Sequence, residues 1–426
     1  MCKVYEDFVH GRSLAELDSC YGDLHLQVEH MNAIDQFREQ TRDWLEANCP
    51  PSQRKAIPEG ELVWGANDVE FPNADAQVWF ERMRDKGWFC PDWPAEYGGA
   101  GLSAEYNAVL ESELRRLKCR PPQINLGIWM LGPVLLEFGT EEQKKHLLTP
   151  MTRGEVRWCQ GFSEPNAGSD LASLKTSARD AGDHFVVDGS KIWTSYGDKS
   201  DWMYALVRTD PKAGKHAGIS LIVLDMKSPG VSVAPIDLIS GKSAFCQVFF
   251  DGVKVPKSQL IGPLHGGWNL AKRLLQHERK AMSKFGEFSL PTHFHLLPLV
   301  SQYLPEPVGQ GEQALVARAV ASAMNEHSYN LTVQRMGEEA RAGQDVSGLM
   351  SIMKLVHTEQ ERDKFEVLLD VMGYHALGWD KGAFSPQEQA ITRGWLNSFA
   401  LTISGGASEI QLNVIAKRVL GLPDVK

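Results

Sequence analysis

The chain has 426 residues, of which 43% are hydrophobic and 23% are charged, and its formal net charge is −10 at pH 7. This length and composition allow two or three cooperating domains with large hydrophobic cores. The negative charge and the lack of a sustained lysine and arginine cluster argue against nucleic acid as the main partner, because neutralising phosphates needs a basic face. Small anionic molecules need only a few local donors and remain possible.

No stretch of the sequence approaches the roughly 18 consecutive apolar residues that a membrane-spanning helix needs, so we expect no membrane insertion. Residues 1–30 resemble neither a secretory signal nor a transit peptide, which predicts an N-terminal extension and a cytoplasmic location. The seven cysteines are widely spaced and include no CxxC pair. This pattern indicates free thiols in a reducing compartment, without a disulfide framework or a zinc site.

The segment that follows the extension has a helical pattern. Apolar residues from Ile34 to Leu45 recur at helical spacing, and the two prolines of NCPPSQ (48–53) end this helix. Further helices are predicted at about 74–86, 103–118, 126–138 and 140–153. We therefore expect an N-terminal helical domain over residues 31–155.

The pattern changes to β-strands near Val156. In HFVVDGSKIWTS (184–195), two strand-like runs flank Asp188-Gly189, which predicts a hairpin with a two-residue turn. Three more strand-like runs are DWMYALVRT, GISLIVLDM and CQVFFDGVKVP. We expect a middle β domain over residues 156–262.

The helical pattern returns after Pro263. Helices are predicted at about 267–286, 313–342, 346–373 and 385–402, with a closing helix after Gly405-Gly406, so a C-terminal helical domain is expected over 263–426. Residues 288–313 have the composition of a loop. His293 and His295 within it could bind a metal, but no acidic or cysteine companions lie nearby, so loop residues are the better interpretation and no metal site is predicted.

Two stretches of the β domain carry groups that could bind a ligand. WCQGFSEPNAGSDLASLKT (158–176) combines hydroxyls, glycines and aromatics, so Gly168 and Ser169 could donate to an anion or heterocycle and Phe162 could cover a ring. Trp193 stands beside two hydroxyl residues at the end of the next strand, although a buried tryptophan is most often a core residue.

Five motifs in this order resemble the acyl-CoA dehydrogenases: GWFCPDWPAEYGGAG, WCQGFSEPNAGSDLASL, DGSKIWTS, VFFDGVKVP and GGASEIQLNVIAKRVLGLP. The resemblance covers about residues 32–424. It implies an α+β multidomain fold with an N-terminal helical domain, a middle β-barrel and a C-terminal four-helix bundle. It also implies non-covalent FAD, a homodimer or homotetramer, α,β-dehydrogenation of a fatty acyl-CoA in β-oxidation, and electron transfer to an electron-transfer flavoprotein.

The resemblance further implies cofactor contacts from the β domain and from the motif after the glycine pair. Ser169 would lie near the cofactor or the CoA chain of the substrate. Each of these residues could instead be a packing residue of its domain. The implied cofactor residues are Gln160, Phe162, Ser163, Ser169, Trp193, Ser195, Ala407 and Glu409.

The reaction needs a base that removes the α-proton of the acyl chain while the β-hydrogen leaves as hydride to flavin N5. Many members of the family have this glutamate at the position occupied here by Gly405. A second arrangement in the family places it on the first long helix of the C-terminal domain, where alignment from Gly267 gives Glu278. Glu409 occupies a position beside the cofactor and is not assigned as the base.

The helical spacing around Glu278 supports this assignment independently of the resemblance. No basic residue lies three or four positions away, so the carboxylate shares an apolar face, and such surroundings raise the pKa of a carboxyl group. The alternative is a structural carboxylate bonded to a distant arginine or backbone amide. The apolar neighbours are Leu274, Leu275, Ala281 and Met282.

Gly405 and Arg279 have further possible roles, and the sequence departs from the family's pattern in two places. The resemblance implies that the backbone N–H of Gly405 polarises the thioester carbonyl, a role that needs no side chain. Arg279 could meet the CoA phosphates or form a structural pair. The Arg-x-x-Phe-Gly that often contacts the FAD pyrophosphate is not found, and DVMGYHALG (370–378) departs from the usual glutamine-bearing loop.

Three functions follow as hypotheses. The first is α,β-dehydrogenation of a fatty or bulky acyl-CoA with Glu278 as the base. The second is a flavin oxidase or monooxygenase on the same fold, and the third is a non-catalytic partner subunit of a hetero-oligomeric dehydrogenase. Moving the base away from Gly405 frees space there, so we expect tolerance of branched, long or bulky acyl chains.

Overall fold

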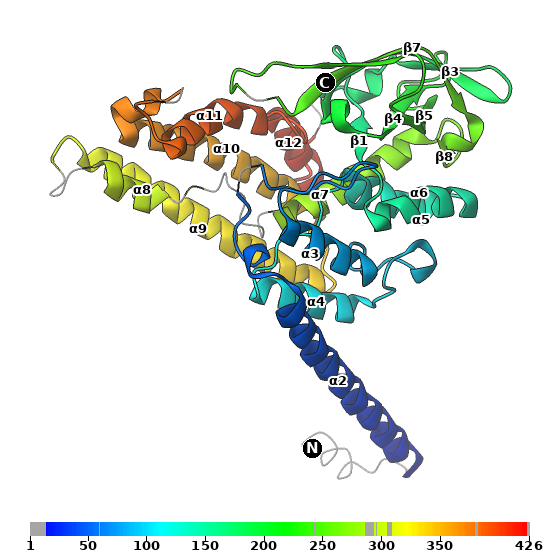
Figure 1. Ribbon diagram of the computed structural model, residues 1–426, viewed down its shortest axis with the longest axis horizontal. Helices are drawn as coiled ribbons and strands as arrows, with labels where there is room; N and C mark the ends of the chain where they lie inside the picture. Colours follow the sequence, from blue (N-terminus) through cyan, green and yellow to red (C-terminus); the bar gives the residue numbers. More distant parts are fainter. Residues whose placement is uncertain are drawn as a thin grey trace. The chain divides into compact units, whose positions relative to one another are not determined.

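The computed structural model describes residues 14–58, 60–241, 243–285, 294, 296–304, 309–379 and 382–423 (Figure 1). The contacts divide the chain into two compact units. One contains the residues up to Ile128 together with Thr140–Arg157, and the other contains Trp129–Gly139 together with the chain from Trp158 onward. Within the described ranges, none of the helices has the length and hydropathy needed to cross a bilayer.

Among its described residues the first unit contains α2 (Leu14–Asn48), α3 (Ala74–Asp85), α4 (Ala104–Arg116) and α6 (Glu141–Arg153). The later three begin at capping side chains, which are Asn73, Ser103 and Thr140. Helix α2 ends before Pro50 and Pro51, as predicted, but it begins at Leu14, inside the segment interpreted as an extension. The apolar periodicity that marked the helix in the sequence starts only near Met31, which explains the difference.

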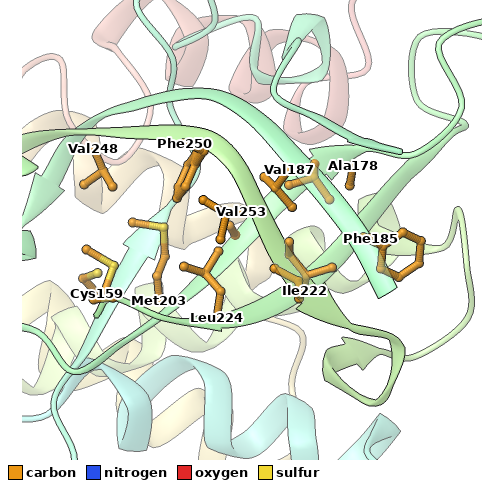
Figure 2. Packing of buried hydrophobic residues seen from close by; sticks show 14 residues of the cluster. Cys159, Ala178, Phe185, Val187, Met203, Ile222, Leu224, Val248, Phe250 and Val253 are labelled. Carbon is orange, nitrogen blue, oxygen red and sulfur yellow. The ribbon is translucent and has the colours of Figure 1, made fainter. Parts of the chain in front are cut away.

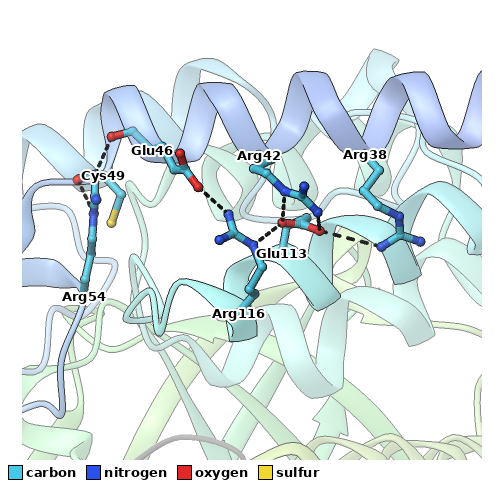
Figure 3. Close-up of polar contacts among 7 residues, drawn as sticks. All are labelled: Arg38, Arg42, Glu46, Cys49, Arg54, Glu113 and Arg116. Carbon is cyan, nitrogen blue, oxygen red and sulfur yellow. Dashed lines mark hydrogen bonds and ion pairs between the residues drawn. The ribbon is translucent and has the colours of Figure 1, made fainter.

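A buried carboxylate joins α2 to α4 (Figure 3). Glu113 of α4 is 2% exposed and accepts hydrogen bonds from Arg42 at 3.2 Å and from Arg116 at 2.6 Å, with Arg38 at 3.7 Å. Burial alone would raise the pKa of Glu113, but the hydrogen bonds and charges of these guanidinium groups hold the pKa below its usual range. The ion pairs therefore fix the C-terminal half of α2 on α4.

The second unit contains the β domain, present as one eight-stranded sheet with the order β6-β7-β3-β2-β4-β5-β8, in which β1 pairs with β4. Side chains from facing strands meet in a core that includes Met203, Leu224 and Val248 (Figure 2). The strands are β1 (Trp158–Gly161), β2 (Ser177–Asp180), β3 (His184–Ser195), β4 (Trp202–Arg208), β5 (Ile219–Asp225), β6 (Val231–Pro235), β7 (Phe245–Pro256) and β8 (Leu260–Ile261).

The predicted hairpin at Asp188-Gly189 is wrong, because β3 continues through both residues and pairs with β7 on either side of them. The pair forms an irregularity in the strand, where the register shifts between Val187 and Gly189. Gly189 has φ 143°, and a Cβ there would lie 2.8 Å from the Cα of Thr176. The glycine thus permits close approach of a neighbouring segment rather than a chain reversal.

A π-helical turn (Gly127–Leu131), which begins in the first unit, leads into α5 (Gly132–Phe138) of the second. Apart from α8, the C-terminal helices agree with the predicted ranges to within a few residues, and α10 packs against α8, α9, α11 and α12. They are α7 (Gly267–Phe285), α8 (Leu296–Tyr303), α9 (Gln313–Arg341), α10 (Ser347–Met372), α11 (Pro386–Leu401) and α12 (Ser408–Val414).

Helix α8 corrects the loop predicted over 288–313. Leu296, Leu299 and Val300 of α8 are buried in the helical core with Phe365. Pro298 stands in the first turn, where its missing N–H is not needed for an intrahelical hydrogen bond. His293 and His295, the two histidines considered as metal ligands, lie outside the described residues.

Candidate active site

Strand β1 and the residues that follow it form one wall of the candidate site. Gln160 of β1 pairs with Tyr204 of β4, and its side-chain Nε2 is buried without a hydrogen-bond partner among the described residues. Phe162 is buried, and its ring meets that of Tyr204 edge-on at a centroid distance of 6.1 Å. A buried amide donor without a partner is costly, so Gln160 indicates a place where a ligand atom accepts a hydrogen bond.

A buried ion pair holds this wall against β3. Lys191 of β3 is fully buried, and its Nζ donates to Glu164 Oε1 at 2.8 Å and to the carbonyl oxygen of Phe162 at 3.1 Å. Glu164 also accepts from the backbone N–H groups of Lys175 and Thr176 at 2.7 and 2.9 Å. Burial lowers the pKa of Lys191 to about 8, against the opposing effect of the Glu164 charge. The pair therefore fixes both ends of the 164–175 loop.

The end of β3 is irregular at Trp193. Its φ of 59° lies in the left-handed region, which is rare for a residue other than glycine, and the register with β7 shifts between Lys191 and Thr194. As a result Trp193 turns outward and is 54% exposed, with its ring 6.1 Å from that of Phe245. Thr194 is buried instead, and its Oγ1 has no hydrogen-bond partner among the described residues.

Tyr204 connects the wall to the predicted base. It is fully buried, and its hydroxyl donates to Met130 Sδ at 3.2 Å. Burial raises the pKa of Tyr204 well above its usual value, and the negative charge of Glu278 adds to this shift. The charge of Glu278 on α7 thus acts on Tyr204, whose ring meets that of Phe162. Tyr204 was not singled out from the sequence, where it is one residue of an apolar strand.

Helix α7 is anchored one turn before Glu278. Arg273 donates through Nε and Nη2 to both carboxylate oxygens of Glu137 on α5, at 2.7–3.0 Å, and His277 Nε2 lies 3.3 Å from the same carboxylate. The hydrogen bonds and charge of Arg273 hold the pKa of Glu137 below its usual range despite partial burial. On the same helix Leu274 is fully buried, as the apolar face predicted.

The glycine pair forms a separate, braced turn between α11 and α12. Gly405 and Gly406 have φ of 64° and 94°. Lys354 of α10 donates from Nζ to the carbonyl oxygen of Gly406 at 2.7 Å, and Gln411 Nε2 donates to that of Gly405 at 3.1 Å. Within the described part of the chain the backbone N–H of Gly405 makes no hydrogen bond, so it is available as a donor.

The predicted site residues thus fall into two groups. Gln160 and Phe162 contact Tyr204, on which the charge of Glu278 also acts. Gly405 lies in the glycine turn and Glu409 in the first turn of α12, where its charge raises the pKa of Lys354 against the larger effect of burial. The remaining predicted residues are Ser163, whose carbonyl oxygen accepts from Ile192; Ser195, paired with Phe245; Ser169, exposed in the loop; Ala407, before α12; and Arg279, whose side chain is not described.

Comparison with known proteins decides the family. The models described as the N-terminal, middle and C-terminal domains of acyl-CoA dehydrogenases match residues 32–155, 159–253 and 265–420. The chain belongs to the acyl-CoA dehydrogenase family. The predicted fold class is thereby confirmed, and this acyl-CoA dehydrogenase is an oxidoreductase that acts on CH–CH donors.

Several relatives are similar over most of the chain. The acyl-CoA dehydrogenase FadE34 of Mycobacterium tuberculosis is 36% identical over 94% of this chain, which spans only 55% of that relative's length. The acyl-CoA dehydrogenase IpdE1 of the same species is 33% identical over 92% of this chain and 99% of its own. A solved structure described as Tcur3481-Tcur3483 steroid ACAD is 27% identical with a TM-score of 0.70, covering 92% of this chain and 98% of that chain.

Members of this family depend on FAD, and the geometry at β1 and β3 fits that cofactor. The two strands contact one another, and both carry a buried polar atom without a partner among the described residues, Gln160 Nε2 and Thr194 Oγ1. A flat ring system with polar edges would supply partners to these atoms and cover the exposed indole of Trp193.

Removing the charge of Glu164 tests the ion pair that fixes this wall. In a Glu164→Gln variant the buried ammonium group of Lys191 loses its counter-charge, so we expect the free energy of unfolding to fall by roughly 3–5 kcal/mol. Denaturant titration followed by tryptophan fluorescence measures this change. The control is Asp180→Asn, which removes an exposed partner of Lys257 and should leave the midpoint unchanged. Equal stability of the two variants would contradict the role given to the pair.

Proposed function

We propose that this chain catalyses the FAD-dependent α,β-dehydrogenation of a bulky acyl-CoA, with Glu278 as the base that removes the α-proton. The observation that carries the proposal is the electrostatic effect of Glu278 on Tyr204, because Tyr204 contacts Phe162 and pairs with Gln160. This effect supports a base that acts on a substrate bound against the wall assigned to the flavin.

The residues of the chain have distinct parts in this reaction. The bound FAD supplies the acceptor for the hydride that leaves the β-carbon. Glu278 takes the α-proton, so the substrate loses two electrons and two hydrogens and becomes the enoyl-CoA. The backbone N–H of Gly405 donates to the thioester oxygen, which stabilises the negative charge that develops as the proton leaves. Ser169 and Arg279 are proposed contacts of the CoA moiety.

The braces seen in the structure suit these roles. The Glu137 carboxylate bonds Arg273 and His277 and thereby fixes the turn of α7 that precedes the base. Lys354 fixes the carbonyl oxygen of Gly406, so the orientation of the peptide groups in the glycine turn is set by a partly buried side chain. Rigid support of this kind keeps a base and an oxyanion donor in place during the reaction.

The assignment of the base is tested by a pair of glutamine variants. Glu278→Gln removes the proton acceptor while preserving side-chain volume, so the rate of anaerobic flavin reduction by acyl-CoA should fall by roughly 10²–10⁴-fold. Stopped-flow absorbance of the flavin measures this rate. Glu366→Gln is the control, since this exposed carboxylate of α10 has no assigned part in binding or catalysis, and its rate should stay within a few-fold of wild type. A wild-type rate in Glu278→Gln together with a comparable loss in FAD-loaded Glu409→Gln would make Glu409 the base.

The proposal of a bulky acyl group rests on the relatives and on the glycine turn. The similar structure is described as a steroid acyl-CoA dehydrogenase, and Gly405 places no side chain where many members have the catalytic glutamate. A Cβ at Gly405 would meet only the Cε of Lys354, at 4.0 Å. A ring-bearing acyl chain therefore encounters less protein at this turn than it would in members with the glutamate there.

Anaerobic titration with a set of acyl-CoAs tests both the substrate class and the electron acceptor. We expect thioesters with ring-bearing or branched chains to bleach the flavin faster than short straight ones. After bleaching, admission of air should restore the colour slowly, whereas added electron-transfer flavoprotein should restore it quickly. A preference for short straight chains would contradict the substrate class, and rapid recovery in air would favour an oxidase.

We also propose a homodimer or homotetramer divided into domains at residues 31–155, 156–262 and 263–426. The matched family models support the division, and exposed apolar side chains on the C-terminal helices, such as Met324, Leu331 and Phe399, support association. A cytoplasmic location stays a prediction.

The mass of the purified chain in solution tests the assembly. Light scattering should give two or four times the chain mass of 47.4 kDa, with FAD retained. A related structure is a complex of ChsE4 and ChsE5 from Mycobacterium tuberculosis, 27% identical with a TM-score of 0.68 over 92% of this chain and 98% of that chain. A monomeric mass would therefore indicate that this chain also needs a second, different chain.

A further inference from the structure

Two cysteines, Cys49 and Cys119, lie together in the first unit. The residues assigned to catalysis, Glu278 and Gly405, belong to the second unit. Cys49 follows the end of α2 and is 2% exposed, and Cys119 follows the end of α4 and is partly exposed (Figure 3 shows Cys49). The two segments are joined at the next residues, because the N–H of Arg120 donates to the carbonyl oxygen of Gln53 at 2.8 Å. Cys49 Sγ lies 3.9 Å from the same carbonyl oxygen.

The two thiols influence each other directly, because the side chain of each is the largest cause of the shift in the pKa of the other. Lys118, the residue before Cys119, has a φ of 54°, so the chain turns sharply after α4 and directs Cys119 back to the end of α2. The ion pairs of Glu113 hold these two helices in place one turn earlier. The sulfur atoms are therefore kept adjacent by the fold rather than by a chance contact of exposed side chains.

The surroundings distinguish the two thiols chemically. The hydrogen bond from Cys119 lowers the pKa of Cys49, and the charge and hydrogen bond of Arg54 reinforce the effect against the opposing influence of burial. Arg54 is held beside Cys49 because its Nε donates to the carbonyl oxygen of Cys49 at 2.8 Å. The Cys119 thiol has a strongly raised pKa and remains protonated. One sulfur is thus prepared as a nucleophile and its neighbour as a proton donor.

We propose that Cys49 and Cys119 form a reversible disulfide when the protein meets hydrogen peroxide. The Cys49 thiolate attacks one peroxide oxygen, the O–O bond breaks, and the product is a sulfenic acid at Cys49 with one water once a proton is taken up. Cys119 then attacks the sulfenic sulfur, the S–O bond breaks, and a second water leaves. Two thiols are oxidised and one peroxide is reduced to two waters. A small oxidant is required because Cys49 is buried.

Cys90 and Cys246 have different surroundings from this pair. Burial raises the pKa of Cys90 well above its usual value, and burial also raises the pKa of Cys246, with the charge of Asp198 adding to the shift. Their thiols stay protonated and react slowly with peroxide. A disulfide between Cys49 and Cys119 would cross-link the C-terminal ends of α2 and α4 and so stabilise the packing of these helices.

Counting thiols before and after oxidation tests the proposal in the holoenzyme. The reduced wild type should show seven thiols after denaturation. Peroxide treatment should lower the number to five, and dithiothreitol should restore it. Peptide mass mapping should find one cross-link, between Cys49 and Cys119. Glutathione disulfide at the same concentration should react at least tenfold more slowly, because it cannot reach Cys49.

Variants with one cysteine replaced distinguish a disulfide between Cys49 and Cys119 from unselective oxidation of the cysteines. Cys119→Ser should stop at a sulfenic acid on Cys49, trapped by dimedone, with no cross-link. Cys90→Ser is the matched control in the same unit and should still lose two thiols. If Cys119→Ser folds poorly, Cys119→Ala gives the same reading. Retention of all seven thiols in peroxide-treated wild type, or a cross-link between other cysteines, would overturn the proposal.

Discussion

The ion pair between Lys191 and Glu164 is the interaction on which the candidate site depends. It joins the loop after β1 to β3 in a region from which water is excluded, and one ammonium group satisfies both a carboxylate and the carbonyl oxygen of Phe162. Buried charges are tolerated only when every hydrogen-bonding position around them is filled, and Glu164 meets this condition with two backbone N–H groups. The wall assigned to the flavin is therefore rigid before any ligand binds.

The same constraint explains the strained end of β3. With Lys191 inside the β domain, regular alternation would also point Trp193 inward. The left-handed conformation at Trp193 reverses this order, so Thr194 is buried and the indole is exposed beside Phe245. Strain of this kind persists only where the surrounding structure determines it, and here β7 pairs with the strand on both sides of the irregularity. Its result is an aromatic surface next to two buried polar atoms without partners.

Much of this arrangement could be predicted from the sequence, and the exceptions have physical reasons. The helices were found because their apolar residues repeat. Glu278 was assigned by alignment of its helix with the family from Gly267, with its spacing from Leu274 as support, and it stays a prediction. The prediction of a hairpin at Asp188-Gly189 was wrong because Asp-Gly is also found where a glycine permits the close approach of another segment, here Thr176. Helix α8 was missed because proline was interpreted as a helix breaker, although in the first turn it is not. Tyr204 and Lys354 act through contacts between distant elements, which no local pattern reveals.

The two elements proposed to carry the base and the oxyanion donor are supported in different ways. The glycine turn is held by hydrogen bonds to its carbonyl oxygens from Lys354 and Gln411, which leaves the N–H of Gly405 as the group it can offer. Lys354 is itself partly buried, with the pKa of its ammonium group lowered by burial, and a carboxylate at Gly405 would stand next to it and would be held in its ionised form. On α7 the charge of Glu278 acts on the buried Tyr204 hydroxyl, and Arg273 and His277 of the same helix are bonded to Glu137. The proposed base on α7 and the proposed donor in the glycine turn are thus supported by separate sets of contacts.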